Sequence, residues 1–522
     1  MDWSVCDCDD GAGVRRVGSP RQIGALMADI KHIFVLMLEN RSFDHLFAFS
    51  GRSGVPAPDP QWGMTADAPD RAPLDPPHEF EDVAAQIGGN PPMSGFAQQA
   101  YWNVSRQGFA AGSLPVLRTL AGQYFLFDNW YSSLPGPTWP NRFFVHAGSS
   151  GGLDNSPSAA TTIESETIDS LSYAFPGGTL YSCLEGAGRR WRVYHDDLFP
   201  QVLAIKDMID PFRLNTDKFS WVRVGERQFF VDDLANGYDI DYTFIEPNYG
   251  LASGGFANGN CQHPIGSMAA GEAFIKYIYD SIRNSPIWPQ SLLIVTYDEH
   301  GAFFDHRSPP PGIPPNNGTQ NHSRAEHPQN FAFDRLGVRV PAIAISPWIA
   351  PGGLGSLAFP GKAFDHTSII KTAMSLLGAS GNLGARVQGT NSFEDICSLP
   401  AMRTDADAVG AALPPAAPAA AVPASVSAAS AAAQAAETPD QATNAFSRIA
   451  MSLDLAMQAA TPLPPVAVTH PSFALDATHA AIMPHAIMMP RTKGQTLDYI
   501  QGVAARVERL RPARPATPRI TS

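Results

Sequence analysis

One apolar run, together with the polar cluster that ends it, constrains this chain more than any other feature of its sequence. Residues 33–38 are continuously apolar over the length of a β-strand, and Glu39 and Asn40 follow directly. Such runs are typical of strands buried on both faces, as in parallel sheets. Ligands of open α/β sheets collect beyond the carboxyl ends of the strands. We therefore expect Glu39 and Asn40 to line a metal or phosphate site; the alternative is that they only cap the next helix.

A second strand repeats this arrangement. Residues 291–297 form another apolar run, which ends at the adjacent carboxylates Asp298 and Glu299. Two neighbouring carboxylates at the end of a buried strand repel each other and lose solvation, and a shared cation offsets both effects. The pattern therefore predicts a divalent metal ion at this point, although carboxylate and amide ligands suit several metals. The alternative is again a helix cap.

Strands and helices alternate along most of the chain, which favours an α/β fold. Further strands are predicted at residues 191–194, 242–245 and 340–346, and residues 269–283 have the apolar spacing of a helix. This alternation predicts a three-layer α/β/α sandwich with a largely parallel central sheet. Residues 51–92 are rich in proline and glycine and are expected to form a long loop over the site.

A proline-rich turn places a hydroxyl next to the expected start of a helix. Thr138 lies in this turn, within SSLPGPTWPNR at 132–142. Free backbone N–H groups and the helix dipole stabilise negative charge on such a hydroxyl and on a bound phosphoryl group. Thr138 is therefore the candidate nucleophile, although a threonine here could serve only as an N-cap. Asn141 and Arg142 are candidate phosphate contacts, but Arg142 could instead pair with a carboxylate.

Three histidines are candidates for the same site. His195 follows the predicted strand 191–194, where either a role in the site or a structural role is expected. His263 lies in a loop before the helix at 269–283, where a histidine in isolation is more often solvated. His78 and its neighbour Glu79 lie in the long loop and could line the site, although solvation is again the usual state of a loop histidine.

Four motifs in the order seen here resemble the bacterial phosphoesterase family of phospholipases C and acid phosphatases. They span about residues 31–380 and are ENRSFDH at 39–45, LPGPTWPNR at 134–142, QHP at 262–264 and TYDEHGAFFDH at 296–306. Each motif alone is moderately specific, whereas the combination is highly specific. One departure is Ala302, where the family usually repeats a glycine.

The resemblance implies a fold like that of the alkaline phosphatase superfamily and a set of functional residues. Thr138 would attack phosphorus and form a phospho-enzyme, and His263 would protonate the leaving alcohol. Family acid phosphatases also place a site histidine near His195. The implied ligands of a divalent metal ion are Glu39, Asn40, Thr138, Asp298 and Glu299.

Three functions are compatible with these residues. A threonine in the GPT motif resembles the phospholipase C branch, which favours hydrolysis of phosphatidylcholine-like diesters. The alternative enzyme is an acid phosphatase acting on monoesters, since the C-terminal modules of the larger phospholipases are missing here. The third possibility is an inactive relative that binds lipid or a partner, and the intact residue set argues against it.

Composition and charge limit the partners. The formal net charge of -13 argues against nucleic acid, because binding to phosphates requires clustered Lys and Arg. No apolar run is long enough to span a membrane, so we expect a phospholipid or small phosphate-ester substrate with at most peripheral lipid contact. Five scattered cysteines do not form a disulfide framework. The N-terminus has Arg15-Arg16 but no apolar signal-peptide core, which indicates a cytoplasmic protein, although relatives are often exported.

The composition changes after about residue 400. Residues 413–437 are almost entirely Ala, Pro and Ser, and amphipathic helices are predicted at 445–459 and 496–510. Arg509 and the arginines after it make the tail basic, and they could meet anionic lipid or a partner, although a solvated end is the more usual state. We expect deletion beyond Pro414 to leave turnover of a soluble ester unchanged. The expected division is an N-terminal arm (1–30), a catalytic domain (31–400), a linker (401–440) and a helical extension (441–522).

Overall fold

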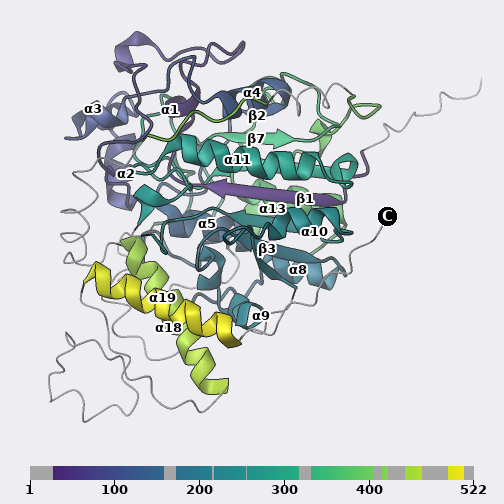
Figure 1. Cartoon of the computed structure of the whole chain (residues 1–522). Coiled ribbons are helices and arrows are strands. Elements are labelled where there is room, and N and C mark those ends of the chain that lie inside the picture. The colour runs from purple at the N-terminus through teal and green to yellow at the C-terminus, as the bar shows by residue number, and fades with distance from the viewer. Residues whose placement is uncertain are drawn as a thin grey trace, which may run out of the picture.

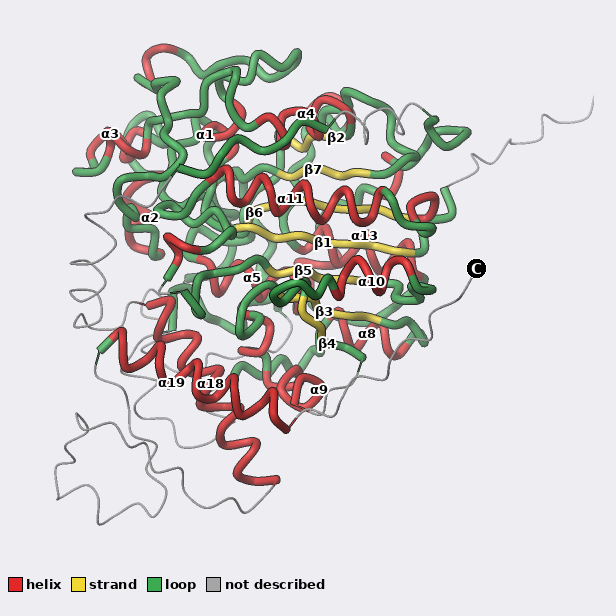
Figure 2. Tube along the Cα trace, viewed as in Figure 1, coloured by secondary structure: helices red, strands yellow, loops and turns green. Residues whose placement is uncertain are grey.

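A seven-stranded sheet forms the centre of the molecule. The structure is a computed structural model, and it describes residues 28–157, 172–213, 217–253, 255–316, 331–404, 413–420, 441–460 and 492–510. The strand order is β2-β7-β6-β1-β5-β3-β4 (Figure 2). The strands are β1 (His32–Leu38), β2 (Phe125–Phe127), β3 (Trp191–His195), β4 (Phe219–Trp221), β5 (Tyr242–Glu246), β6 (Ser291–Tyr297) and β7 (Ala342–Ile345).

The strand predicted at 33–38 is confirmed, and it is the middle strand of the sheet. β1 pairs in parallel with β5 on one side and β6 on the other, so Val35 lies between Phe244 and Ile294. All of its residues are buried, as its continuous apolar run predicts. β7 pairs antiparallel with both β6 and β2, which makes the sheet mixed but mostly parallel.

Helices cover both faces of this sheet, which confirms the predicted three-layer α/β fold. α10 and α11 lie in front of the sheet and α13 behind it (Figure 1). α4 packs on α11, while α5 and α8 pack on α13. The helices are α1 (Phe43–Phe47), α2 (Phe80–Ile87), α3 (Trp102–Ser105), α4 (Pro115–Gln123), α5 (Thr138–Ala147), α8 (Leu180–Gly186), α9 (Ile209–Arg213), α10 (Phe229–Ala235), α11 (Met268–Arg283), α12 (Gly355–Ala358), α13 (Thr367–Leu377), α14 (Ala385–Gly389), α18 (Gln441–Ala460) and α19 (Lys493–Leu510).

The segment at 51–92 is not one long loop, as the sequence suggested, because it contains α2. Glu79 caps the start of this helix in a capping box. Its side chain accepts a hydrogen bond from the Asp82 backbone N–H, and the Asp82 side chain accepts one from the Glu79 backbone N–H. Phe80, Val83 and Ile87 bury one face of the helix. Their spacing of three and four residues was readable, but the surrounding prolines and glycines obscured it.

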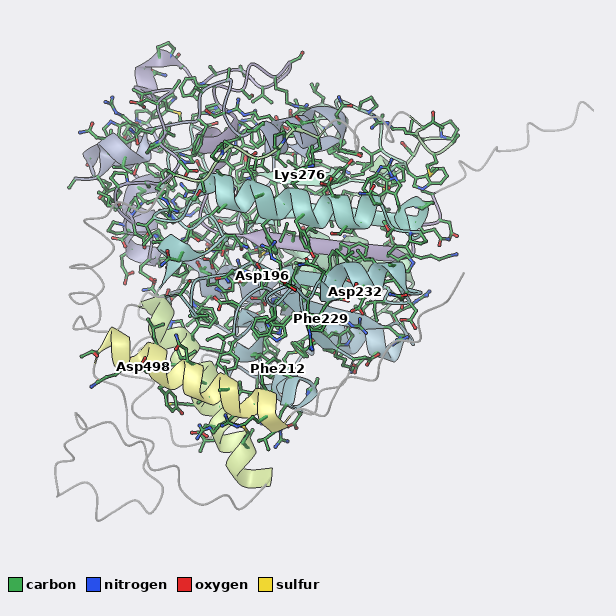
Figure 3. The ribbon with its side chains drawn as sticks, viewed as in Figure 1. Asp196, Phe212, Phe229, Asp232, Lys276 and Asp498 are labelled. Carbon is green, nitrogen blue, oxygen red and sulfur yellow. The ribbon has the colours of Figure 1, made fainter. Side chains whose placement is uncertain are left out.

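The two C-terminal helices pack on the sandwich, contrary to the expectation that the linker separates them from it. α18 contacts α9 and the 3-10 helix η3 (Gln201–Ala204), and α19 packs on α18. Phe446, Ile449 and Leu453 of α18 are buried in the main hydrophobic core. In Figure 3, Phe212 on α9 and Asp498 on α19 mark the side of the molecule where these helices meet.

Several sequence expectations fall outside the described residues. These include the Arg15-Arg16 pair, most of the linker and the basic tail beyond residue 510. Within the described chain, no helix combines the length and apolar character that crossing a bilayer requires.

Candidate active site

The ends of β1 and β6 bring the predicted polar residues together. The two strands are parallel neighbours whose last residues pair, so the residues after them lie at the same edge of the sheet (Figure 2). The backbone N–H of Asn40 donates to Asp298 Oδ1 at 3.1 Å, and that of Arg41 donates to the Glu299 carbonyl oxygen at 2.9 Å. Glu39, Asn40, Asp298 and Glu299 therefore form one buried cluster.

Thr138 lies at this cluster as the first residue of α5. Pro137 precedes it and ends the extended turn, so the helix begins where the proline-rich motif predicted. Thr138 Oγ1 donates to Asn40 Oδ1 at 3.3 Å. Thr138 thus lies at a helix N-terminus, where backbone N–H groups and the helix dipole stabilise developing negative charge.

Arg142, one turn along α5, connects the carboxylates of the two strands. Its Nε donates to Asp298 Oδ2 at 2.9 Å, and its Nη2 lies 3.6 Å from Glu39 Oε1. Arg142 therefore pairs with carboxylates, which is one of the two roles that the sequence allowed for it. Nη1 is buried and has no hydrogen-bond partner. A phosphate oxygen would satisfy it, so pairing and phosphate binding are compatible roles.

Asn141 holds the turn that precedes Thr138. Its Oδ1 accepts from the Leu134 backbone N–H at 3.1 Å, and its Nδ2 donates to the carbonyls of Gly136 and Pro137 at 2.9 and 3.0 Å. The amide is thus occupied within the turn. Its predicted contact with phosphate stays a prediction.

Burial makes two carboxylates of this cluster, those of Glu39 and Asp298, costly to ionise. It raises the pKa of Glu39 to about 8, because the nearby Asp298 charge adds to the effect and Arg142 only partly opposes it. Burial likewise raises the pKa of Asp298 to about 6. Glu39 Oε2 and Glu299 Oε1 are buried without hydrogen-bond partners. Carboxylate oxygens that lack hydrogen-bond partners, in a cluster that also holds an amide and a hydroxyl oxygen, are the ligand types of a hard or borderline divalent cation.

His78 belongs to this cluster. Its Nε2 lies 3.2 Å from Asn40 Nδ2 and 3.7 Å from Glu299 Oε1, and its Nδ1 donates to the Pro76 carbonyl at 2.7 Å. Burial lowers its pKa, but the charges of Glu299 and Asp75 outweigh burial and raise the pKa to about 10. The sequence favoured solvation because a loop histidine has no periodicity to reveal burial.

Gln86 of α2 fixes the segment that bears His78. Its Nε2 donates to the Pro77 carbonyl at 2.8 Å, and its Oε1 lies 2.8 Å from Nε2 of His300, the neighbour of Glu299. Gln86 thus connects the segment at 51–92 to the turn that follows β6. No sequence signal at Gln86 pointed to this contact.

His263 lies beside His78. The two ring centroids are 6.1 Å apart, and His263 Nε2 lies 3.6 Å from Asp75 Oδ2. Phe256 stacks on the His263 ring at 3.8 Å, which restricts its rotation. Ligand atoms of Asp75, His78 and His263 lie within 4.8 Å of one another, so this trio is a second arrangement able to hold a metal. The part of His263 in the reaction stays a prediction.

His195 occupies different surroundings. It ends β3, two strands from β1, and its ring packs against Trp221 and Phe212 with centroids 4.4 and 6.1 Å away. Its Nδ1 donates to the Asp197 carbonyl at 2.6 Å. These contacts favour the structural role, and the catalytic role stays a prediction.

A second acidic cluster holds the turn after β6 in place. Asp44, Asp305 and His306 offer ligand atoms within 4.8 Å of one another. Arg339 already pairs with Asp44 Oδ1 at 2.7 Å and with Asp305 Oδ2 at 3.0 Å. The guanidinium balances these carboxylates, which explains them without a cation. We interpret this cluster as structural.

The turn after β6 explains why a glycine stands at position 301 of the TYDEHGAFFDH motif. A Cβ at Gly301 would lie 2.4 Å from the Asn40 carbonyl oxygen, so only glycine permits the close approach of the two turns. Ala302 has a φ of 58°, in the left-handed region that favours glycine. The departure at Ala302 therefore imposes local backbone strain and leaves the polar cluster intact.

Comparison with known proteins identifies a family that covers most of the chain. Residues 30–378 match the Phosphoesterase family. The chain is 34% identical over 408 residues to "Non-specific phospholipase C6" of Arabidopsis thaliana, which covers 72% of this chain and 74% of that protein. It is 26% identical to "Non-hemolytic phospholipase C" of Pseudomonas aeruginosa over 66% of this chain and 53% of that protein. The similarity therefore extends to plant proteins and is not limited to bacterial ones.

Among solved structures, the chain is similar to a protein in the alkaline phosphatase superfamily from Vibrio parahaemolyticus. The TM-score is 0.34 and the identity 12%, with 71% of this chain and 73% of that chain covered.

The mixed sheet, with a hydroxyl, an arginine and buried carboxylates at its carboxyl edge, belongs to an enzyme that hydrolyses phosphate esters. The chain is a member of the Phosphoesterase family.

Proposed function

We propose that this phosphoesterase is a phospholipase C that hydrolyses phosphatidylcholine-like diesters through Thr138. One observation carries the proposal: Thr138 Oγ1 lies at the N-terminus of α5 and is hydrogen-bonded to Asn40 within the carboxylate cluster. The names of the relatives favour a diester over a monoester substrate.

The chain's own residues divide the work of the reaction. Thr138 Oγ1 loses its proton to solvent and attacks phosphorus while the bond from phosphorus to the glycerol oxygen breaks. Arg142 Nη1 and the first N–H groups of α5 bind the phosphoryl oxygens. His263 donates a proton to the departing diacylglycerol oxygen. Water then hydrolyses the phosphothreonine diester and releases the phosphorylated headgroup.

A divalent metal ion completes this site. Glu39, Asn40, Thr138, Asp298 and Glu299 would hold it, with the orphaned oxygens of Glu39 and Glu299 among the ligands. When bound, it would supply positive charge that lowers the pKa of the threonine hydroxyl and stabilises the phosphoryl oxygens.

The experiment compares p-nitrophenyl phosphorylcholine with p-nitrophenyl phosphate. We expect kcat/KM to be higher for the diester by at least tenfold and to fall at least 10³-fold in Thr138→Ala. Circular dichroism verifies that the variant is folded. The reverse preference would establish the acid phosphatase alternative, and normal turnover by Thr138→Ala would exclude the threonine mechanism.

Lipid contact and location are further parts of the proposal. The described part of α19 exposes Leu510 and Arg509 at its end, the residue types that bind an anionic bilayer surface. We expect a cytoplasmic enzyme that reaches its lipid peripherally. Vesicle sedimentation with and without anionic lipid, combined with cell fractionation, tests both points.

A further inference from the structure

Helix α18 packs directly on the residue that follows the proposed nucleophile. Phe446 of α18 is 1% exposed, and its ring lies against Trp139 with centroids 5.3 Å apart and planes at 73°. Trp139 is the second residue of α5 and is itself 2% exposed. The backbone at Thr138 therefore borders an aromatic contact with a segment some three hundred residues further along the chain.

Phe446 also touches the residue that supports Arg142. Its ring lies 5.4 Å from that of Tyr249. The guanidinium carbon of Arg142 lies over the Tyr249 ring at 5.5 Å, and the Tyr249 hydroxyl donates to Glu246 Oε2 at 2.8 Å. Phe446 thus fills the space between the neighbour of Thr138 and the support of Arg142.

Contacts further along the helix from Phe446 hold α18 in this place. The guanidinium of Arg448 lies over the Tyr173 ring at 5.4 Å, and Arg213 of α9 donates to the Ala456 carbonyl at 2.6 Å. α19 braces α18 from outside, since Arg506 pairs with Asp454 at 2.7 Å. Anchored at separate points, α18 presents Phe446 to α5 in one defined position.

We propose that Phe446 is a positioning residue for the reaction, which extends the proposed function by making α18 part of the active-site wall. A ring between Trp139 and Tyr249 fixes the first turn of α5 and the side chain of Arg142 relative to the ends of β1 and β6. Nucleophilic attack depends steeply on such placement, because a displacement of about 1 Å costs on the order of 100-fold in rate.

Full-length Phe446→Ala tests this inference, with Leu453→Ala as the matched control. Leu453 is fully buried in the same helix, two turns or about 10 Å further along it. Both variants lose core volume in α18, but only the first empties the space beside Trp139. Activity is expressed per folded molecule, with the folded fraction taken from urea unfolding.

We expect Phe446→Ala to lower kcat on p-nitrophenyl phosphorylcholine at least tenfold with KM changed less than threefold. Leu453→Ala should keep kcat within twofold of wild type. Phe446→Leu, which retains most of the volume, should recover at least a third of the lost kcat. Equal losses of kcat in Phe446→Ala and Leu453→Ala would overturn the positioning role, because they would reflect general destabilisation.

A spectroscopic measurement follows the contact itself. In protein labelled with 5-fluorotryptophan, the ¹⁹F signal of Trp139 is assigned by its loss in Trp139→Phe. It should shift or broaden in Phe446→Ala and stay in place in Leu453→Ala. An unmoved signal in Phe446→Ala would contradict the inference even if kcat fell.

Thr138→Ala assayed in parallel separates the two proposals. Full turnover in Thr138→Ala would overturn the proposed function and the role of Phe446 together. Normal turnover in Phe446→Ala beside an inactive Thr138→Ala would overturn the role of Phe446 alone.

Discussion

The Thr138 hydroxyl donates a hydrogen bond to Asn40 Oδ1 across 98 positions of sequence, at a distance of 3.3 Å. This contact joins the start of α5 to the end of β1. It places a hydroxyl group, the N-terminus of a helix and four buried polar residues at one edge of the sheet.

Arg142→Met should impair both stability and turnover. Removing a buried guanidinium leaves Asp298 and Glu39 without their positive partner, which costs about 3 kcal/mol of unfolding free energy. Since Arg142 also binds the phosphoryl group in our proposal, kcat should fall about 10²-fold. Arg339→Met, which breaks the Asp44 and Asp305 pairs, is the control. It should lose similar stability in urea yet keep kcat per folded molecule.

The stability of the protein, after a chelator has removed any metal ion, should depend on pH through Glu39. Burial raises its folded pKa to about 8 from an ordinary value near 4.5. The folded protein therefore retains a proton that the unfolded chain has lost, and stability declines as pH rises from about 4.5 to about 8. The difference from Glu39→Gln isolates this contribution, which we expect to be on the order of a few kcal/mol. Urea unfolding at several pH values measures it, and parallel curves for the two proteins would contradict the assigned pKa.

Removal of divalent metal ions should abolish turnover while leaving the fold intact. Calorimetric titration of the metal-free enzyme with a divalent metal ion should then show binding. This binding should be lost in Glu299→Gln, because Glu299 Oε1, which has no hydrogen-bond partner, is a proposed ligand. Asp305→Asn should bind as wild type does, because Arg339 already balances that cluster. Loss of binding in Asp305→Asn but not in Glu299→Gln would contradict the proposed ligands, because it would place the metal ion in the cluster that contains Asp305.

Ala302→Gly should stabilise the enzyme by about 0.5–1 kcal/mol. Ala302 has a φ of 58°, where glycine avoids the strain that a Cβ imposes, although its greater unfolded-state entropy offsets part of the gain. Ala342→Gly in β7 is the opposite case and should destabilise a buried strand by about 1 kcal/mol. The midpoints and slopes of urea unfolding measure both effects, and a stability loss in Ala302→Gly would contradict the strain argument.

Local sequence patterns predicted the central strands of the sheet and much of the cluster. The apolar runs ending at Glu39 and Asp298 define strands whose bounds agree closely with the structure. Their meeting at one edge follows from parallel pairing. The burial of His78 and the packing of Phe446 were not predicted, because both depend on contacts between segments far apart in sequence. No local periodicity encodes such contacts.

The C-terminal helices show the same limit most clearly. Their amphipathic spacing predicted α18 and α19, but not the surface that α18 covers. An Ala/Pro linker suggested independence, whereas Phe446 and Ile449 are buried in the main core. A chain ended at Pro414 should therefore lose most turnover of a soluble ester, instead of keeping it as the sequence suggested. Unchanged turnover in that truncated chain would show that α18 is dispensable.

The most direct test of the account is to trap the covalent intermediate on Thr138. The enzyme is mixed with excess p-nitrophenyl phosphorylcholine, quenched in acid within its first turnovers, and digested for mass spectrometry. We predict a phosphorylcholine group on the peptide that contains Thr138, together with a burst of p-nitrophenol equal to one group per active site. Turnover with an unmodified Thr138 and no burst, or with the group on another residue, would contradict the central claim.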